Sequence, residues 1–210
     1  MTTPRRALIV IDVQNEYVTG DLPIEYPPVE TSLANIGRAM DAAREAGVPI
    51  VVVQNIAPST SPLFARGGAM AELHPVVSSR AYDHHVEKSL PSAYANTDLG
   101  AWLAAREIDT LTVIGYMTHN CDASTIFHAV HDGLAVEFLD DATGSVPYTN
   151  SAGAASAEEI HRVFSVVLQS RFAAVASTGQ WIEALKGGAP LERSNIYVSN
   201  QQARAARTTG

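Results

Sequence analysis

Runs of consecutive aliphatic residues, separated by segments of helical periodicity, constrain the fold of this chain more than any other feature. Residues 7–13 (ALIVIDV) and 49–55 (PIVVVQN) are typical of strands that are buried on both faces. Between them, apolar residues recur at the spacing of one helix face, and Gly47 stands where a helix C-cap is expected. The spacing therefore predicts a strand, a helix and a second strand in succession.

The same alternation continues to residue 187. Further strands are predicted over 110–116, 134–142 and 172–178. Helices are predicted over 97–107, from near Cys121, over 156–170 and over 178–187. Strands that alternate with helices require right-handed crossovers and a mostly parallel sheet. We therefore predict a three-layer α/β/α fold with a mostly parallel, doubly wound sheet.

Two segments depart from this rhythm. Residues 56–85 form a long, proline-containing stretch, and loops of this length in a compact domain are usually functional. Residues 188–210 show little apolar periodicity. We predict one domain over 1–187 and a C-terminal tail over 188–210, which frays or contacts a neighbouring subunit as an arm.

Composition excludes several classes of function. The formal net charge of −8 argues against binding to nucleic acid or to acidic membranes. No apolar stretch approaches the ~18 residues of a membrane-spanning helix, and no signal-peptide pattern is present at the start. The single cysteine cannot form an internal disulfide, which suits a reducing compartment. We therefore expect a soluble, cytoplasmic protein.

Three ionisable residues are expected at the carboxyl ends of strands, where ligand sites of open α/β sheets collect. Asp12 ends the first aliphatic run, Lys88 follows a short extended stretch, and Cys121 follows the strand over 110–116. The sheet would bring these three side chains to one edge. Each also has a structural interpretation that must be weighed.

Cys121 is either a nucleophile or a buried filler. If Thr118 caps the following helix, Cys121 lies in its first turn, where the helix N-terminus lowers a thiol pKa and offers N–H groups to an oxyanion. Free cysteines are, however, among the most buried residue types and are usually inert. The position of Cys121 alone does not favour the nucleophile over the buried filler.

Asp12 and Lys88 are stronger candidates for catalysis together than either is alone. A carboxylate at the position of Asp12 is nearly desolvated, which raises its pKa and suits a general base; the alternative is a simple cap of the following turn. A lone lysine on a loop is usually just solvated. Beside Asp12 and Cys121, however, Lys88 would keep the carboxylate ionised and stabilise a thiolate.

Metal and nucleotide sites are not indicated. The chain has His84, His85, His128 and His131, but the sequence places no further ligands at convergent positions beside either pair. It contains neither G-x-x-x-x-G-K-[ST] nor G-x-G-x-x-G after a strand. We expect no metal and no cofactor. His119, two residues before Cys121, is an alternative base that we rank below Asp12.

Four segments carry a resemblance to a known family. They are ALIVIDVQNEYV around Asp12, VEKSLPSAYANTDLGAWL around Lys88, VIGYMTHNCDAST around Cys121, and FLDDATGS. In this order they resemble the isochorismatase-like (cysteine hydrolase) superfamily over residues 6–186. The three motifs around Asp12, Lys88 and Cys121, found in this order, are far more specific than any one of them.

The resemblance implies a Cys–Asp–Lys triad. Asp12 takes the thiol proton, Lys88 stabilises the charged pair, and Cys121 attacks a carbonyl to give an acyl-thioester. It also implies a cis peptide at Tyr116–Met117, which aims the N–H groups of Met117 and Cys121 at the oxyanion. Family members commonly form dimers or tetramers, so a homo-oligomer is expected.

Departures from the family's motifs restrict the classes of substrate that we expect. Residues 51–56 lack the Asp-x-His motif of zinc-containing nicotinamidase-type members, and retention of Cys121 favours C–N over vinyl ether hydrolysis. We therefore expect metal-independent hydrolysis of a small amide, carbamoyl or ureido compound. An isochorismatase-type ether hydrolase and a catalytically idle binding module on the same fold remain alternatives. The candidate pocket residues, for which simple packing is the other interpretation, are Gln14, Tyr94, Phe64 and Tyr148.

Overall fold

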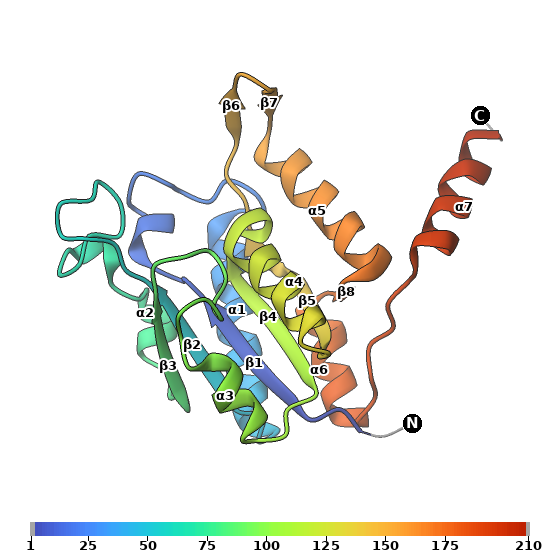
Figure 1. The fold of residues 1–210 in the computed structure, drawn as a ribbon, viewed down its shortest axis with the longest axis horizontal. Helices are drawn as coiled ribbons and strands as arrows, with labels where there is room; N and C mark the ends of the chain where they lie inside the picture. Colours follow the sequence, from blue (N-terminus) through green and yellow to red (C-terminus); the bar gives the residue numbers. More distant parts are fainter. Residues whose placement is uncertain (1–2, 209–210) are drawn as a thin grey trace.

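A six-stranded parallel sheet forms the centre of the protein, for which the computed structural model describes residues 3–208 (Figure 1). The strand order is β3-β2-β1-β4-β5-β8, and every neighbouring pair is parallel. The bounds are β1 Arg6–Ile11, β2 Ile50–Asn55, β3 His84–Lys88, β4 Thr110–Tyr116, β5 Ala135–Gly144 and β8 Ala174–Ala176. A separate antiparallel hairpin consists of β6 Tyr148–Asn150 and β7 Gly153–Ala155.

Helices cover both faces of the sheet. They are α1 Val29–Glu45, α2 Pro75–Ser78, α3 Leu99–Ala104, α4 Ala123–His131, α5 Ala157–Arg171, α6 Thr178–Gly187 and α7 Ile196–Thr208. Three short helical turns are η1 Asn15–Tyr17, η2 Ala69–Ala71 and the π-helical η3 Thr118–Asp122. None of the helices within residues 3–208 is long and apolar enough to cross a membrane.

Alternate side chains of the strands enter two separate cores. Leu8 and Val10 of β1 pack with residues of α1 and α6, whereas Ile9 and Ile11 pack with residues of α3, α4 and α5. All six residues of β1 are buried, as expected for a central strand covered on both faces. The prediction of a three-layer α/β/α fold with a parallel sheet is confirmed.

Local sequence signals explain where several helices begin and end. Ser156 and Glu159 form a capping box at the start of α5, and Ser177 and Gln180 form another at the start of α6. After α1, Gly47 adopts a φ of +69°, the left-handed conformation that glycine favours at a helix end.

Two parts of the chain are more regular than the sequence analysis expected. The long stretch over 56–85 contains η2, α2 and the start of β3, which runs parallel to β2 at the edge of the sheet. Within β3 only Val86 is an apolar residue that enters the core, so no aliphatic run marks this strand. The tail contains α7, a helix that the sequence analysis did not predict.

The strand order of the sheet reverses between β1 and β4. From β1 the chain proceeds through β2 to β3 on one side, and from β4 through β5 to β8 on the other. In open α/β sheets, the carboxyl ends of strands at such a reversal are where ligands bind. Gly115 of β4 lies so close to β1 that an added Cβ would be 2.0 Å from the Ile11 carbonyl oxygen. Only glycine permits this approach.

Candidate active site

Three side chains from separate parts of the chain meet at the carboxyl ends of the central strands, beside this reversal. Lys88 Nζ lies 2.6 Å from Asp12 Oδ2 and 3.3 Å from Cys121 Sγ. The ammonium group therefore bridges the carboxylate and the thiol. The side chains of Asp12 and Lys88 are fully buried, and Cys121 is 6% exposed. The structure thus brings together the three residues that the sequence analysis singled out.

Asp12 directly follows β1 in a strained conformation. Its φ is 51°, in the left-handed region that non-glycine residues rarely adopt, although aspartate tolerates it better than most. Its backbone N–H donates to the Val53 carbonyl of β2, so the sheet holds the turn. Burial raises the pKa of the Asp12 carboxyl, and the Lys88 ammonium acts in the opposite direction. A carboxylate whose pKa is raised is better suited to accept a proton.

Lys88 is the last residue of β3. Burial disfavours its charged form, but the charges of Asp12 and Cys121 outweigh burial and raise the pKa of the ammonium group. Lys88 therefore stays protonated at neutral pH. Its positive charge is compensated inside the protein by Asp12.

Cys121 lies in η3, the π-helical turn between β4 and α4. The prediction that Thr118 caps a helix containing Cys121 in its first turn is wrong in this detail. Thr118 Oγ1 is instead within hydrogen-bond distance of Thr143 Oγ1 (3.0 Å) and His161 Nδ1 (2.9 Å). Thr118 is fully buried, so its hydroxyl serves the contact between η3, β5 and α5 rather than the turn's own N–H groups.

The resting thiol is neutral. Burial raises the pKa of the Cys121 thiol, the charge of Asp12 raises it further, and Lys88 only partly opposes them. The expectation of a thiol pKa lowered by a helix N-terminus is therefore wrong for this state. A proton must leave Cys121 before it can act as a nucleophile, and Asp12 is the nearby group that shares Lys88 with it.

The segment ahead of the thiol has an unusual backbone. The peptide bond between Tyr116 and Met117 is cis, and Gly115 before it has a φ of +116°. The Met117 carbonyl accepts hydrogen bonds from the N–H groups of Asn120 and Asp122, which closes the turn around Cys121. The Tyr116 hydroxyl is 2.7 Å from Ser32 Oγ of α1, which anchors this end of β4.

Two of the four candidate pocket residues serve the fold instead. The Gln14 amide nitrogen donates to the carbonyls of Asn55 and Ala71, and its oxygen accepts from the Asn55 N–H. Gln14 is fully buried and clamps β2 and η2 to the segment after β1. Tyr94 stacks on His128 of α4, with ring centroids 4.4 Å apart. Burial and the charge of Asp132 raise the pKa of the Tyr94 hydroxyl, and the buried ring packs beside α3 and α4.

The other two candidates lie on the site's side of the molecule. The Phe64 ring packs 5.2 Å from the Tyr17 ring, centroid to centroid. The Tyr148 hydroxyl is 2.9 Å from His119 Nε2, and the charge of Cys121 contributes to raising the pKa of Tyr148. His119 Nδ1 is 3.1 Å from Ser145 Oγ, so both ring nitrogens have partners other than the thiol. Burial lowers the pKa of His119 to about 4, and its ring is neutral at pH 7.

Sequence reasoning missed two residues beside the triad. Tyr17 is 2% exposed, and after burial the charges of Asp12, Cys121 and Asp122 raise the pKa of its hydroxyl. Asp122 is fully buried, and its carboxyl oxygens have no hydrogen-bond partner among the described residues. Burial and the charge of Asp12 raise the pKa of Asp122 well above its usual range, which favours its protonated form. An acidic residue directly after the cysteine was the available signal.

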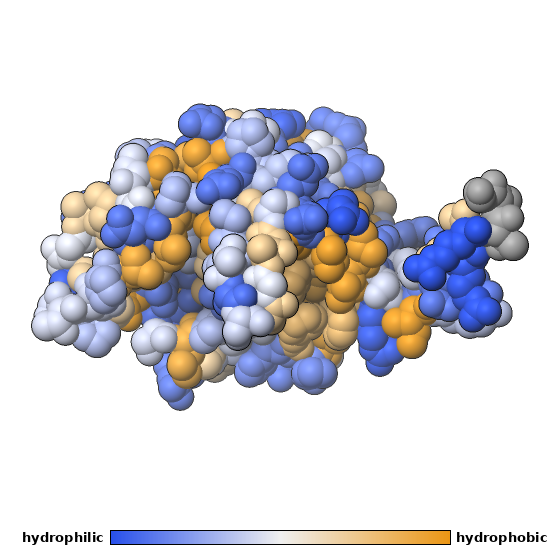
Figure 2. All heavy atoms as spheres, turned by 90° about the horizontal axis from the view of Figure 1, so that it is seen from above, coloured by the Kyte–Doolittle hydropathy of each residue, from blue (hydrophilic) through white to orange (hydrophobic). Residues whose placement is uncertain are grey.

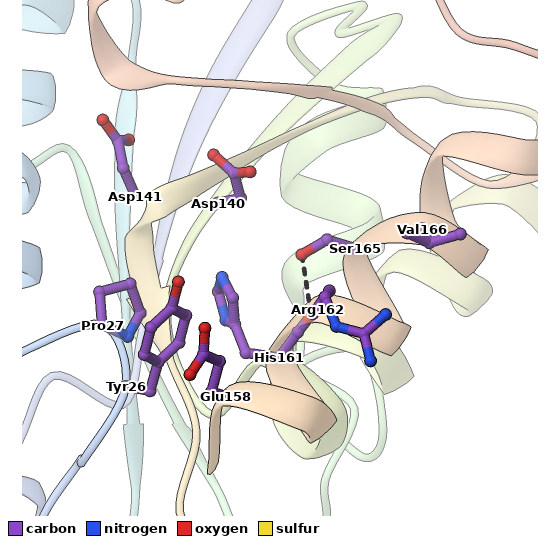
Figure 3. A pocket seen from close by; sticks show the side chains of 9 residues that line it. All are labelled: Tyr26, Pro27, Asp140, Asp141, Glu158, His161, Arg162, Ser165 and Val166. Atoms are coloured by element: carbon purple, nitrogen blue, oxygen red, sulfur yellow. Dashed lines mark hydrogen bonds between the residues drawn. The ribbon is translucent and has the colours of Figure 1, made fainter. Parts of the chain in front are cut away.

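A separate pocket of about 400 Å³ is lined by residues of β5 and α5 and by the segment ahead of α1 (Figure 3). Asp140 and Asp141 of β5, His161 of α5 and Tyr26 are among the residues that line it. It contains no triad residue, and His161 links it to η3 through Thr118. Within residues 3–208, no three His, Cys, Asp or Glu side chains are grouped so that they could hold a metal ion.

Comparison with known proteins assigns the chain to a family. A model of the isochorismatase domain matches residues 6–180. The chain belongs to the isochorismatase family. The resemblance found in the sequence is thereby confirmed, and the matched residues include all six strands of the central sheet as well as Asp12, Lys88 and Cys121.

Solved structures and sequences of this family agree with the assignment. An isochorismatase-like protein from Burkholderia xenovorans LB400 is 81% identical, with a TM-score of 0.98 over 99% of this chain and 100% of that chain. A cysteine hydrolase from Pseudomonas syringae pv. phaseolicola 1448A is 27% identical, with a TM-score of 0.80 over 90% of this chain and 95% of that chain. The secreted isochorismatase effector Isc1 of Verticillium dahliae is 30% identical over 81% of this chain and 90% of its own length.

Some family members are named for hydrolysis of C–N bonds. The N-carbamoylsarcosine amidase of an Arthrobacter species is 26% identical over 64% of this chain and 56% of that enzyme. A ureidoacrylate amidohydrolase of Variovorax paradoxus is 29% identical over 65% of this chain and 68% of that enzyme. The family to which this chain belongs therefore consists of hydrolases that include amidases acting on amides and ureido compounds.

Proposed function

We propose that this protein hydrolyses a C–N bond of a small amide, carbamoyl or ureido compound through an acyl-thioester on Cys121, without a metal ion. One observation carries the proposal: the Lys88 ammonium contacts both the Asp12 carboxylate, at 2.6 Å, and the Cys121 thiol, at 3.3 Å. A carboxylate, a thiol and a shared cation in one buried site are the parts that covalent amide hydrolysis requires.

The first step forms the nucleophile. Asp12, whose pKa is raised by burial, accepts the proton of Cys121, and Lys88 stabilises the resulting thiolate. The net charge of Asp12, Cys121 and Lys88 together stays zero, because the negative charge moves from the carboxylate to the sulfur beside the same ammonium group. Proton transfer within a dry site avoids the cost of creating an isolated buried charge.

The second step breaks the C–N bond. The thiolate attacks the carbonyl carbon, and the N–H groups of Met117 and Cys121 donate to the oxyanion. The tetrahedral intermediate expels the amine, which takes the proton from Asp12. Asp12 then takes a proton from water, the hydroxide attacks the thioester, and the proton returns to the sulfur. One water molecule is consumed, and the products are an acid and an amine.

Relatives support C–N chemistry over ether hydrolysis. The amidase and the amidohydrolase named above are similar to this chain, and this chain has the cysteine that an ether hydrolase does not need. The vinyl ether reaction would require Asp12 and Lys88 but not the thiol.

The test is a turnover screen that measures ammonia release from primary amides, carbamoyl compounds and ureas. Wild type, Cys121→Ser and Asp12→Asn are compared on each active compound. We expect both variants to lose about 10³-fold or more in kcat, because the residues act as one unit. Turnover of an ether substrate that survives Cys121→Ser would support the vinyl ether alternative. Absence of turnover across the panel would support a binding module.

A further inference from the structure

We propose that the site selects an uncharged acyl group, and that it discriminates against substrates that carry a carboxylate. This inference rests on the proposed hydrolysis at Cys121 and names the substrate class. It follows from the charges and the rings that surround the thiol.

The site has no spare positive charge for an anion. Within residues 3–208, Lys88 is the one cation whose charge acts on Asp12, Cys121 and Asp122. That ammonium is already paired with Asp12 at 2.6 Å. Arg66, on the neighbouring loop, is paired with Glu87 at 2.9 Å. An entering carboxylate would have to lose its water without gaining a cation.

Two further groups make the site less favourable for an anion. Asp122 adds a second carboxyl beside the Asp12–Lys88 pair, fully buried and without a hydrogen-bond partner among the described residues. Its carboxyl supplies no positive charge to an anion, and if ionised it would repel one. His119 cannot help, because its ring is neutral at pH 7.

Aromatic rings, rather than further charged groups, lie around the site. The Tyr17 ring lies 5.2 Å from Phe64 and 5.5 Å from Tyr116, and the Tyr148 ring lies 5.0 Å from His119. Tyr148 reaches the turn that contains Cys121 through His119, 2.9 Å from its hydroxyl, and Tyr17 packs on Tyr116 at the end of β4 that precedes this turn. Rings with polar tips suit a flat or branched apolar group that carries an uncharged polar atom. The substrate class is therefore a neutral aromatic or aliphatic amide or urea, not an amino-acid-derived ureido acid.

The test uses two alkylating reagents of nearly equal size, neutral iodoacetamide and anionic iodoacetate. Cys121 is the single cysteine of the chain, so mass spectrometry of the intact protein reports its labelling alone. The rates at pH 7.5 are each divided by the rate with N-acetylcysteine. We expect the normalised rate of iodoacetamide to exceed that of iodoacetate at least tenfold. A ratio near one, a preference for iodoacetate, or labelling by neither reagent would overturn the inference.

A matched pair of variants locates the effect. Tyr148→Arg adds a cation beside the thiol, whereas Tyr82→Arg adds one at a similarly exposed tyrosine just before β3. We expect only Tyr148→Arg to raise the relative rate of iodoacetate, by about fivefold or more. An equal effect of both variants would show that overall net charge, not the site, sets the preference.

The labelling experiment separates this inference from the proposed function because it requires no turnover. Benzamide and 4-carbamoylbenzoate then compare a neutral and an anionic amide of the same shape. If Cys121-dependent hydrolysis occurs but favours 4-carbamoylbenzoate, the substrate class is wrong and the proposed function stands. If labelling is selective but no amide is hydrolysed, the proposed function is wrong and the preference of the site for an uncharged group stands.

The C-terminal helix carries a second, independent inference. In Figures 1 and 2, α7 projects from the body of the molecule. Residues 196–207 are exposed except for Ser199, which is half-buried, and three consecutive apolar residues begin the helix: Ile196, Tyr197 and Val198. An isolated helix of this length is marginal in water, so α7 needs a packing partner.

The geometry points to a second copy of this chain as that partner. Val163, Val166 and Val167 form an exposed apolar stripe at helical spacing on α5, beside the point from which the arm departs. The segment over 192–210 contains three arginines and one glutamate, whereas the chain as a whole has a net charge of −8. We infer that α7 of each copy packs on the α5 stripe of the other. A closed two-fold exchange satisfies both surfaces at once.

Full-length variants test the arm exchange. We expect wild type to elute as a dimer in size-exclusion chromatography with light scattering, and Val166→Glu and Tyr197→Glu each to give monomers that remain folded by circular dichroism. Tyr82→Glu, at an exposed tyrosine elsewhere, should leave the dimer intact. A monomeric wild type, or a dimer that survives both interface variants, would overturn the inference.

Discussion

Lys88 Nζ lies 2.6 Å from Asp12 Oδ2, and both side chains are completely buried. A buried ion pair is costly to break from one side, because the remaining charge has neither water nor a counterion. The catalytic proposal and the stability of this region therefore depend on the same contact.

Replacing the lysine should destabilise the protein. We expect Lys88→Met to lower the free energy of unfolding by about 3 kcal/mol at pH 7, since it leaves the Asp12 carboxyl unpaired. The double variant Asp12→Asn/Lys88→Met should recover more than half of this loss, although it stays inactive. Urea unfolding of the three proteins measures both values. Equal stability of wild type and Lys88→Met would contradict an ionised pair.

Asp122 should make stability depend on pH. Its folded-state pKa is raised, so the folded protein keeps a proton that the unfolded chain releases above pH ~4. This contribution is fully present below the unfolded pKa and is lost as pH rises through the folded pKa. We expect Asp122→Asn, which cannot ionise, to become increasingly more stable than wild type between pH 5 and pH 8. Urea unfolding at both pH values checks this, and a constant difference would count against it.

The approach of β4 to β1 can be tested with two glycines. At Gly115 an added Cβ would meet the Ile11 carbonyl oxygen at 2.0 Å, whereas at Gly133 it would meet nothing within 4 Å. Both have a positive φ, so both alanine variants share backbone strain. We expect Gly133→Ala to cost about 1–2 kcal/mol and Gly115→Ala to cost clearly more. Thermal melts of the two variants make the comparison, and similar melting temperatures would refute a close contact.

Replacing Tyr17 and Tyr94 in turn tests which of the two rings lies at the substrate site. We expect Tyr17→Phe to lower kcat/KM by about 3–10-fold, because a hydroxyl near the thiol is lost to the substrate. Tyr94→Phe should leave kcat/KM within twofold of wild type, since the Tyr94 hydroxyl is buried without a hydrogen-bond partner among the described residues and faces α4. Steady-state kinetics on one amide compares them. The reverse ranking would place the pocket on the α3–α4 side.

Much of this architecture could be read from the sequence. Aliphatic runs such as residues 7–13 identify strands buried on both faces, and parallel strands bring residues at their carboxyl ends together whatever the loops between them. That is why Asp12, Lys88 and Cys121 could be expected to meet although they are far apart in the chain. The edge strand β3 was visible only as a short extended stretch, because one face of HHVEK is exposed.

Side-chain directions outside the regular elements could not be read in the same way. The choice between Tyr94 and Tyr17 depends on which ring the surrounding helices accept, and spacing carries no such information. Gln14 has the polarity of a ligand-binding residue, yet backbone groups of β2 and η2 use its amide. The neutral state of the thiol follows from burial, which only the packed structure reveals.

Acylation of Cys121 is the central claim, and the mass of the protein after one burst of an activated ester tests it most directly. Wild type is mixed with neutral p-nitrophenyl benzoate, quenched with acid as the first equivalent of p-nitrophenol appears, and digested. We expect the peptide that contains Cys121 to carry one benzoyl group, and Cys121→Ala to show neither burst nor adduct. A full burst that leaves Cys121 unmodified would contradict the account.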